Sequence, residues 1–343
     1  MNAGLEVLTP GLHTTVQDLG RVGYQDIGVP VSGALDPFGL RLANALVGNP
    51  EGMAALEVLM SGPSCKVAGD SVRVALVGAG ARLEIGGERG RIVAAGQSIR
   101  LGQDEVFRIV VGRQSACCYL AVEGGLAVPL VLGSASTYVR AALGGLDGRA
   151  LRSGDVVPLA KDAAERAELR VPTAFPGSGE QPVRVILGPQ HEYFRQEAIE
   201  ALFNAEFRVS NDADRMGMRL DGPLLRHRAS WDIASDAIAT GSIQVPGSGQ
   251  PIVLLADHQT TGGYPKIATV ISVDVPVVGR RRPGDPLRFV EIDVDAAEQT
   301  CRDEEDRFAA VIAALEPVTE ESGLDFASLY RNNLISGVTT GLK

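Results

Sequence analysis

The sequence has little positive charge, few cysteines and no long apolar segment. Its 42 acidic residues outnumber 32 basic ones, and the formal net charge of −10 argues against nucleic acid or an anionic membrane as the main partner. No apolar run approaches the roughly 20 residues of a membrane-spanning helix, and the first residues do not show the basic and apolar regions of a signal peptide. The four cysteines form no CxxC pair and no disulfide framework. We therefore expect a reduced, cytoplasmic protein.

Common cofactor motifs are also missing. No lysine follows a glycine, so there is no GxxxxGK[ST] phosphate loop. The GxG at residues 78–80 lacks the third glycine of a dinucleotide fingerprint, because Leu83 stands in its place. The four histidines show no HExxH or Cys/His spacing, so we expect no metal site. These absences count against an independent NTPase, a nicotinamide enzyme and a zinc hydrolase.

Lysine is scarce, with 28 arginines but only four lysines. Because arginine supplies positive charge elsewhere, a retained lysine indicates a need for a compact, titratable ammonium group, although chance also explains so small a number. Lys266 is the lysine that lies in the polar stretch HQTTGGYPK, residues 258–266.

Short apolar runs between turn residues predict a mainly-β protein. The runs SVRVALV, FRIVV, CCYLAV, VRVIL and PIVLLA have the length and composition of strands in sandwiches and barrels. Few helices are expected: Asp36 as N-cap and Pro37 at the first helical position begin one that stops at Gly48. Others are expected near 190–203 and 296–315.

The charged and then Pro-, Gly- and Ser-rich stretch at 160–182 is a candidate boundary. We predict an N-terminal β subdomain over 1–165 and a C-terminal β-barrel subdomain over 182–292. A C-terminal helix and an irregular tail are expected over 293–343.

Three polar clusters are candidates for function. The first lies between residues 13 and 36, where glycines permit close backbone approach. Its candidate substrate-binding residues are Gln17, Asp18, Arg21 and Ser32. The alternative is a set of turns at a barrel mouth, with Arg21 and Asp18 as a structural ion pair.

The second cluster is NDADRMGMRLDGP, residues 211–223. Its acidic residues suit a turn, while Arg215 and Arg219 have the chemistry to bind a carboxylate or phosphate. We predict a catalytic role for Arg215 and a substrate-binding role for Arg219. A solvated turn followed by an edge strand is the alternative.

The third cluster joins the strand PIVLLAD to the expected strand IATVISVDV, so its polar groups lie on a connection held by buried strands. A lysine there can clamp an anion or act as a base, glycines can turn backbone N–H groups toward an anion, and glutamine can bind an amide. The alternatives are a surface salt bridge for Lys266 and a loop histidine with satisfied hydrogen bonds. We predict catalytic roles for Lys266, His258 and Gln259, and substrate binding by Gln244, Thr260, Thr261, Gly262, Gly263 and Tyr264.

These clusters together resemble a known family. The stretches are TVQDLGRVGYQDIGVPVSGALD, TYVRAALGGLDGRALRSGD, DRMGMRL and GSIQVPGSGQPIVLLADHQTTGGYPKIATV. They are similar to the allophanate hydrolase subunit 2 family, also called the biotin-dependent carboxyltransferase subdomain A/B family, which includes a 5-oxoprolinase subunit. The likeness extends over nearly the whole chain, to about residue 290.

The resemblance implies two cyclophilin-like β-barrel subdomains and a role in a heteromeric enzyme. The implied partners are an allophanate hydrolase subunit 1-like protein and a LamB/YcsF-like protein, which together convert 5-oxoproline to glutamate at the expense of ATP. ATP is expected in a site shared with the partners. Two alternatives stay open: a carboxyltransferase component that uses carboxybiotin on urea or a related amide, and a non-catalytic antagonist of a kinase inhibitor.

Overall fold

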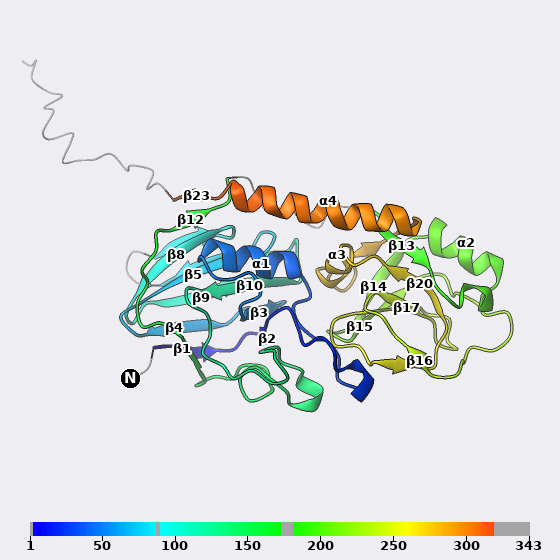
Figure 1. Ribbon diagram of the computed structural model, residues 1–343, viewed down its shortest axis with the longest axis horizontal. Coiled ribbons are helices and arrows are strands. Elements are labelled where there is room, and N and C mark those ends of the chain that lie inside the picture. The colour runs from blue at the N-terminus through cyan, green and yellow to red at the C-terminus, as the bar shows by residue number, and fades with distance from the viewer. Residues whose placement is uncertain (1–2, 87–89, 173–180, 319–343) are drawn as a thin grey trace, which may run out of the picture.

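The computed structural model describes residues 3–86, 90–172 and 181–318. Figure 1 shows two β-rich bodies side by side, with the long helix α4 (Val294–Ala313) lying across both. We call the body formed by strands β1 to β12 the first domain, and the body formed by β13 to β22 the second domain. The prediction of a mainly-β chain with few helices is confirmed.

Two facing sheets form the first domain around a shared apolar core. Their strand orders are β11-β1-β4-β9-β6-β7 and β2-β3-β10-β5-β8-β12-β23. In strand β4, Cys65 and Val67 point into the core while Lys66 pairs with Glu6 at 2.9 Å, as the two-residue period of a half-buried strand requires. The strands are β1 (Gly4–Thr9), β2 (His13–Gln17), β3 (Ala55–Leu59), β4 (Ser64–Ala68), β5 (Ser71–Val77), β6 (Arg82–Ile85), β7 (Arg91–Ala94), β8 (Gln97–Gly102), β9 (Val106–Val110), β10 (Cys117–Val122), β11 (Val156–Pro158), β12 (Leu169–Arg170) and β23 (Glu316–Pro317).

Helix α1 (Pro37–Leu46) covers the outer face of strands β5 and β10 and is itself covered by α4. Asp36 caps it as predicted, accepting a hydrogen bond from the Gly39 backbone N–H at 3.1 Å. The ring of Phe38 meets that of Phe308 of α4 edge to face, with centroids 5.2 Å apart. Both faces of β5 and β10 are therefore covered, and every residue of these two strands is buried.

The second domain is one nearly closed sheet in the order β21-β14-β15-β18-β17-β20-β13-β22. Its two edge strands are consecutive in the chain, and Phe207 and Phe289 meet across the remaining gap with ring centroids 5.9 Å apart. Together with the first domain, this barrel confirms the predicted pair of β subdomains. Its elements are β13 (Val183–Leu187), α2 (Gln196–Asn204), β14 (Phe207–Ala213), β15 (Gly217–Asp221), β16 (Asp236–Ala237), β17 (Ser242–Gln244), β18 (Ile252–Leu254), β19 (Thr261–Gly262), β20 (Lys266–Val270), α3 (Val275–Gly279), β21 (Pro286–Leu287) and β22 (Phe289–Glu291).

Two local expectations were wrong in detail. The expected strand IATVISVDV ends at Val270, and the residues after it form a turn and the short helix α3. The helix expected near 190–203 is divided: a 3-10 turn at His191–Tyr193 precedes α2. The expected tail from residue 319 onward lies outside the described residues.

A buried charge network joins the two domains. Arg215, in the turn between β14 and β15, forms ion pairs with Glu57 of β3 and with Asp257, at 2.8 Å from its Nε to Asp257 Oδ2. Its Nη2 donates to the Gly33 carbonyl at 2.6 Å, and Tyr119 donates to Glu57 at 2.7 Å. We call Arg215, Glu57 and Asp257 the junction network. Because both the carboxylates and the guanidinium are buried, this contact fixes the second domain against the first.

Candidate functional site

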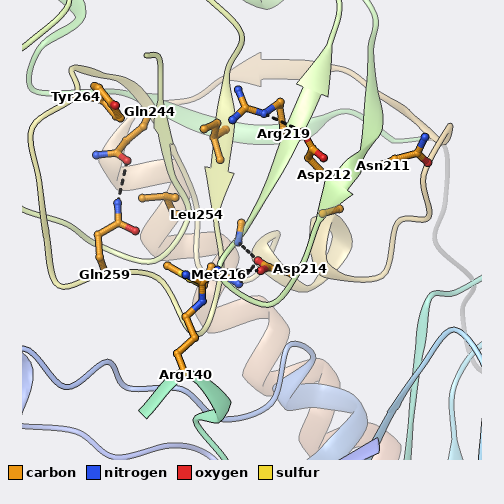
Figure 2. A pocket seen from close by; sticks show the side chains of 13 residues that line it. Arg140, Asn211, Asp212, Asp214, Met216, Arg219, Gln244, Leu254, Gln259 and Tyr264 are labelled. Atoms are coloured by element: carbon orange, nitrogen blue, oxygen red, sulfur yellow. Dashed lines mark hydrogen bonds and ion pairs between the residues drawn. The ribbon is translucent and has the colours of Figure 1, made fainter. Parts of the chain in front are cut away.

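A pocket of about 510 Å³ lies in the second domain and is closed on one side by the first. Figure 2 shows Arg140 entering from below, while Gln244, Gln259 and Tyr264 lie on the left and Arg219 with Asp212 on the far side. Arg140 belongs to a 3-10 turn of the first domain, Val139–Ala141. The pocket is lined by Arg140, Asn211, Asp212, Ala213, Asp214, Met216, Gly217, Arg219, Gln244, Ile252, Leu254, Gln259 and Tyr264.

Two glutamine amides line one part of this pocket. Gln259 Nε2 donates to Gln244 Oε1 at 3.2 Å. Gln244 is only 2% exposed, and its own Nε2 has no hydrogen-bond partner among the described residues. Because an unsatisfied buried donor is unfavourable by about 1–3 kcal/mol, this N–H pair is a ready site for a ligand carbonyl.

Gly262 provides the space that this amide occupies. A Cβ at Gly262 would lie 2.8 Å from Gln244 Nε2 and 2.7 Å from Ile238 Cδ1, whereas at Gly263 the nearest atom would be the Ile233 carbonyl oxygen at 3.4 Å. An alanine at 262 would therefore displace the ends of the Gln244 and Ile238 side chains, whereas an alanine at 263 would make ordinary contact. Neither glycine has the left-handed conformation that a backbone anion nest uses, so the predicted nest is not formed.

The pocket contains charges of both signs in two loose pairs. Arg140 Nη2 lies 3.4 Å from Asp214 Oδ2, and Arg219 Nε lies 3.6 Å from Asp212 Oδ2. Between the polar groups, Met216, Ile252 and Leu254 supply apolar surface. The arrangement suits a small ligand that has an amide, a hydrocarbon part and a negative charge.

His258 is held by two structural hydrogen bonds beside the pocket. Its Nδ1 lies 2.6 Å from the Gln259 carbonyl and its Nε2 lies 3.0 Å from Thr240 Oγ1, so Nδ1 carries the proton and Nε2 accepts from the hydroxyl. Burial lowers the pKa of His258, which favours this neutral form. The alternative of a loop histidine with satisfied bonds describes this geometry.

Lys266 is buried behind the pocket and is absent from its lining. It begins strand β20, is 3% exposed, and its Nζ lies 2.9 Å from Asp236 Oδ2. The hydrogen bond from Lys266 lowers the pKa of Asp236. Strand β16, which contains Asp236, pairs with β19 of the loop, so this ion pair ties the loop to the segment that covers it.

The backbone of the loop at 258–266 also forms hydrogen bonds with the segment that contains β16. The Thr260 carbonyl accepts from the Ile238 N–H at 3.1 Å and the Gly263 carbonyl from the Ile233 N–H at 2.9 Å. Thr261 pairs with Ala237 and is exposed. Of the predicted loop residues, Gln259 and Tyr264 are the two that line the pocket.

The N-terminal candidates lie in the first domain away from the pocket lining, and all are buried. Asp18 accepts from the hydroxyls of Ser134 at 2.6 Å and Ser136 at 2.5 Å, while Arg21 donates to the Ser136 carbonyl. The alternative of an ion pair between Arg21 and Asp18 is therefore not realised; both residues instead fix the segment at residues 134–136. Gln17 donates to the Thr137 carbonyl at 3.1 Å in the same region, and the backbone N–H of Ser32 donates to the Ala256 carbonyl at 3.1 Å.

A family model described as the carboxyltransferase domain, subdomain A and B, matches residues 27–291. This chain belongs to that family. The match contains every residue that lines the pocket, the loop at 258–266 and the junction network. The family predicted from the sequence motifs is thus confirmed.

Named relatives within the carboxyltransferase family differ in the reactions that their names describe. The chain is 34% identical to a subunit of the 5-oxoprolinase of Escherichia coli over 307 residues, which cover 89% of this chain and 96% of that protein. A solved structure named TTHA0988 is 36% identical with a TM-score of 0.74, over 84% of this chain and 56% of that one. The solved Kluyveromyces lactis urea carboxylase is 28% identical with a TM-score of 0.80, over 90% of this chain and 29% of that longer one.

The pocket also contains residues that the sequence analysis did not select as candidates. Asn211, Asp212 and Asp214 were assigned only to a turn, although the same segment supplied Arg219. Arg140 was quoted within the motif TYVRAALGG but given no role. That motif was the available signal, since nothing local to Arg140 reveals that it meets a different domain.

Proposed function

We propose that this chain is a subunit of an ATP-dependent 5-oxoprolinase that opens 5-oxoproline to L-glutamate in the cytoplasm. It acts with an allophanate hydrolase subunit 1-like protein and a LamB/YcsF-like protein. The observation that carries the proposal is the buried, unpartnered amide donor of Gln244 in a polar pocket, in a chain similar over most of its length to a 5-oxoprolinase subunit.

The pocket chemistry supports an amide substrate. Gln244 Nε2 donates to the lactam carbonyl and strengthens that bond as negative charge develops on the oxygen. Gln259 holds Gln244 in this orientation through their hydrogen bond. Leu254 and Met216 contact the ring methylenes.

The other predicted catalytic residues act on the framework of this pocket. Lys266 holds the covering segment through Asp236, His258 fixes the Gln259 backbone, and Arg215 fixes the domains. Among the described residues, none of the pocket-lining side chains is a serine, cysteine or lysine nucleophile. We therefore propose that ATP binds a composite site and that the activating chemistry is completed by the partner proteins.

Reconstitution tests the proposal. The chain is mixed with its two companions, ATP and 5-oxoproline, and glutamate is followed. Glutamate that forms only when this chain is present supports the catalytic-subunit proposal, and glutamate that forms equally well without it refutes it.

The two loop glycines give a matched test of the pocket. Gly262→Ala displaces the ends of the Gln244 and Ile238 side chains, so we expect about tenfold lower turnover in the reconstituted mixture, which corresponds to about 1.4 kcal/mol of lost transition-state stabilisation. Gly263→Ala is the control and is expected to keep near wild-type turnover. Equal activities of the two variants would remove Gln244 from the site.

The variant Lys266→Arg tests whether activity depends on the ion pair between Lys266 and Asp236. An arginine preserves the charge, but its broader head does not fit a buried position whose partner lies 2.9 Å away. We expect a folded protein with reduced activity in the assembled enzyme, measured by circular dichroism and glutamate release. Unchanged turnover would leave Lys266 with only a structural role.

A second candidate is a carboxyltransferase component that acts on urea or a related amide with carboxybiotin. The similarity to the K. lactis urea carboxylase favours it, and Gln244 would donate equally well to a urea carbonyl. Carboxylation of urea by this chain together with a biotin carboxylase and a biotinylated carrier, without glutamate formation in the first assay, would select it.

A further inference from the structure

Within the described part of the chain, Arg140 is the only pocket-lining residue that the first domain contributes. Building on the proposed function, we infer that Arg140 binds the carboxylate of a small carboxylated lactam. When the substrate is absent, Arg140 forms an ion pair with Asp214 instead.

The ion pair between Arg140 and Asp214 is weak enough for a ligand carboxylate to replace Asp214. It is a single contact of 3.4 Å, and the two side chains are 61% and 58% exposed. Exposed pairs of this kind contribute about 0–1 kcal/mol, whereas a carboxylate that meets the planar guanidinium side-on forms two charge-assisted hydrogen bonds. A substrate carboxylate therefore competes well with Asp214.

Asp214 itself does not follow Arg140 when the pair opens. Its Oδ1 accepts from the backbone N–H groups of Met216 at 2.7 Å and Gly217 at 3.2 Å. These bonds anchor the carboxylate in its own turn. Asp214 is thus a positioning residue that directs the Arg140 guanidinium at the pocket in the empty protein.

The turn that bears Arg140 is well defined. Ala142 adopts a left-handed conformation at the end of this turn, and Tyr138 and Leu143 form a bridge across its base. The backbone beneath Arg140 is therefore fixed while its long side chain is exposed. This combination allows the head group to move by rotamer changes alone.

Three parts of a carboxylated lactam then have separate partners. The carbonyl meets the unpartnered Gln244 amide, the ring methylenes meet Leu254 and Met216, and the carboxylate meets Arg140. Figure 2 shows Arg140 and the glutamine pair on different sides of the pocket, and the proposed ligand lies between them. Because the pocket otherwise belongs to the second domain, such a ligand also links the two domains.

The test compares two ligands that differ only by the carboxylate: 5-oxoproline and 2-pyrrolidinone. Binding is measured by calorimetry on the full chain and on the assembled complex without ATP. The single tryptophan, Trp231, is a second reporter, since its ring lies 6.2 Å from that of the pocket residue Tyr264.

We expect the wild type to bind 5-oxoproline at least about tenfold more tightly than 2-pyrrolidinone, a preference that corresponds to about 1.4 kcal/mol. Arg140→Gln should abolish this preference and leave 2-pyrrolidinone binding unchanged. Arg140→Lys should keep part of it, because the charge remains but the two-point contact does not. Arg219→Gln removes the other arginine of the same pocket and tests the competing assignment, in which Arg219 binds the carboxylate; if Arg140 binds it, this variant keeps the preference.

The outcomes separate this inference from the proposed function. If both ligands bind with equal affinity, or if Arg219→Gln and not Arg140→Gln removes the preference, the role of Arg140 is refuted while the lactam site stands. If neither ligand binds the chain or the complex, the inference and the 5-oxoprolinase proposal are both overturned.

Discussion

Two of the arginine–carboxylate contacts that join the domains of this protein differ in almost every physical respect. At the junction network, Arg215 of the second domain is buried between Glu57 and Asp257. At the pocket, Arg140 of the first domain meets Asp214 in solvent. Asp214 and Arg215 are consecutive residues, so a single turn supplies one group to each contact.

The comparison shows that burial determines whether an arginine–carboxylate pair fixes the structure or remains available to a ligand. Burial alone would lower the pKa of Arg215, but the charges of Glu57 and Asp257 outweigh it and raise that pKa well above its usual value. The guanidinium is therefore permanently charged and permanently paired. The Arg140 contact contributes little to stability, and this leaves Arg140 available to a ligand.

The largest expected effect comes from Arg215→Met, which leaves Glu57 and Asp257 as buried, uncompensated charges. We expect a loss of about 3–5 kcal/mol in the free energy of unfolding, measured by urea denaturation. The triple variant with Glu57→Gln and Asp257→Asn should recover part of this loss, because the stranded charges are gone. A loss below about 1 kcal/mol for Arg215→Met would mean that the junction resembles the pocket contact.

A smaller effect is expected from Tyr119→Phe. The hydroxyl donates to Glu57 and accepts from the Asp36 N–H at 2.8 Å, and burial followed by the charge of Glu57 raises its pKa so that it stays protonated. Removing it leaves the N–H unsatisfied, at about 1–3 kcal/mol of unfolding free energy. The exposed Tyr193→Phe is the control and should be neutral within about 0.5 kcal/mol.

The pH dependence sharpens the comparison because His258 follows Asp257 of the junction network. Burial lowers the pKa of His258 below its usual value of 6.5, so below about pH 6.5 the unfolded chain binds a proton that the folded chain does not. The free energy of unfolding should therefore fall with decreasing pH, by at most about 1.4 kcal/mol per pH unit for this group. Burial also lowers the pKa values of His13 and His227, which add to the slope.

Urea denaturation between pH 7.5 and 5.5 measures this slope for the wild type and for His258→Gln. The variant should show a shallower slope below pH 6.5 and the same slope as the wild type near pH 7.5. Identical slopes at acid pH would show that His258 takes up a proton equally in both states.

The smallest effect on stability is expected from Arg140→Gln. The pair it breaks is exposed and 3.4 Å long, so the free energy of unfolding should change by less than about 1 kcal/mol. If Arg140→Gln lowered the free energy of unfolding as much as Arg215→Met, the distinction between the two contacts would be wrong, because Arg140 would then also stabilise the folded structure.

The sequence predicted those features that depend on residues close together in the chain. Asp36 and Pro37 begin α1 as expected, since capping depends on neighbours in the chain. The loop at 258–266 was expected between strands, and Gln244, Gln259, Tyr264 and Arg219 all line one pocket.

The contacts that the sequence did not reveal involve partners that are distant in the sequence. Lys266 pairs with Asp236 and Arg215 with Glu57, 158 positions away, and no periodicity in a single chain specifies such pairs. Arg140 belongs to the pocket only because the domains pack together. The β-rich run after Val270 was misread because a turn and helix α3 follow, and valines do not distinguish a buried short helix from a strand.

The path of the chain through β23 has a consequence for synthesis on the ribosome. Strand β12 of the first domain pairs with β23, and Phe38 of α1 packs on Phe308 of α4, although nearly the whole second domain is translated in between. The first domain to emerge therefore keeps an open sheet edge and a bare apolar helix face until residues 294–317 leave the exit tunnel. The native order of completion is the reverse of the order of translation: the second barrel can close first, and the segment that follows it then completes the domain made before it.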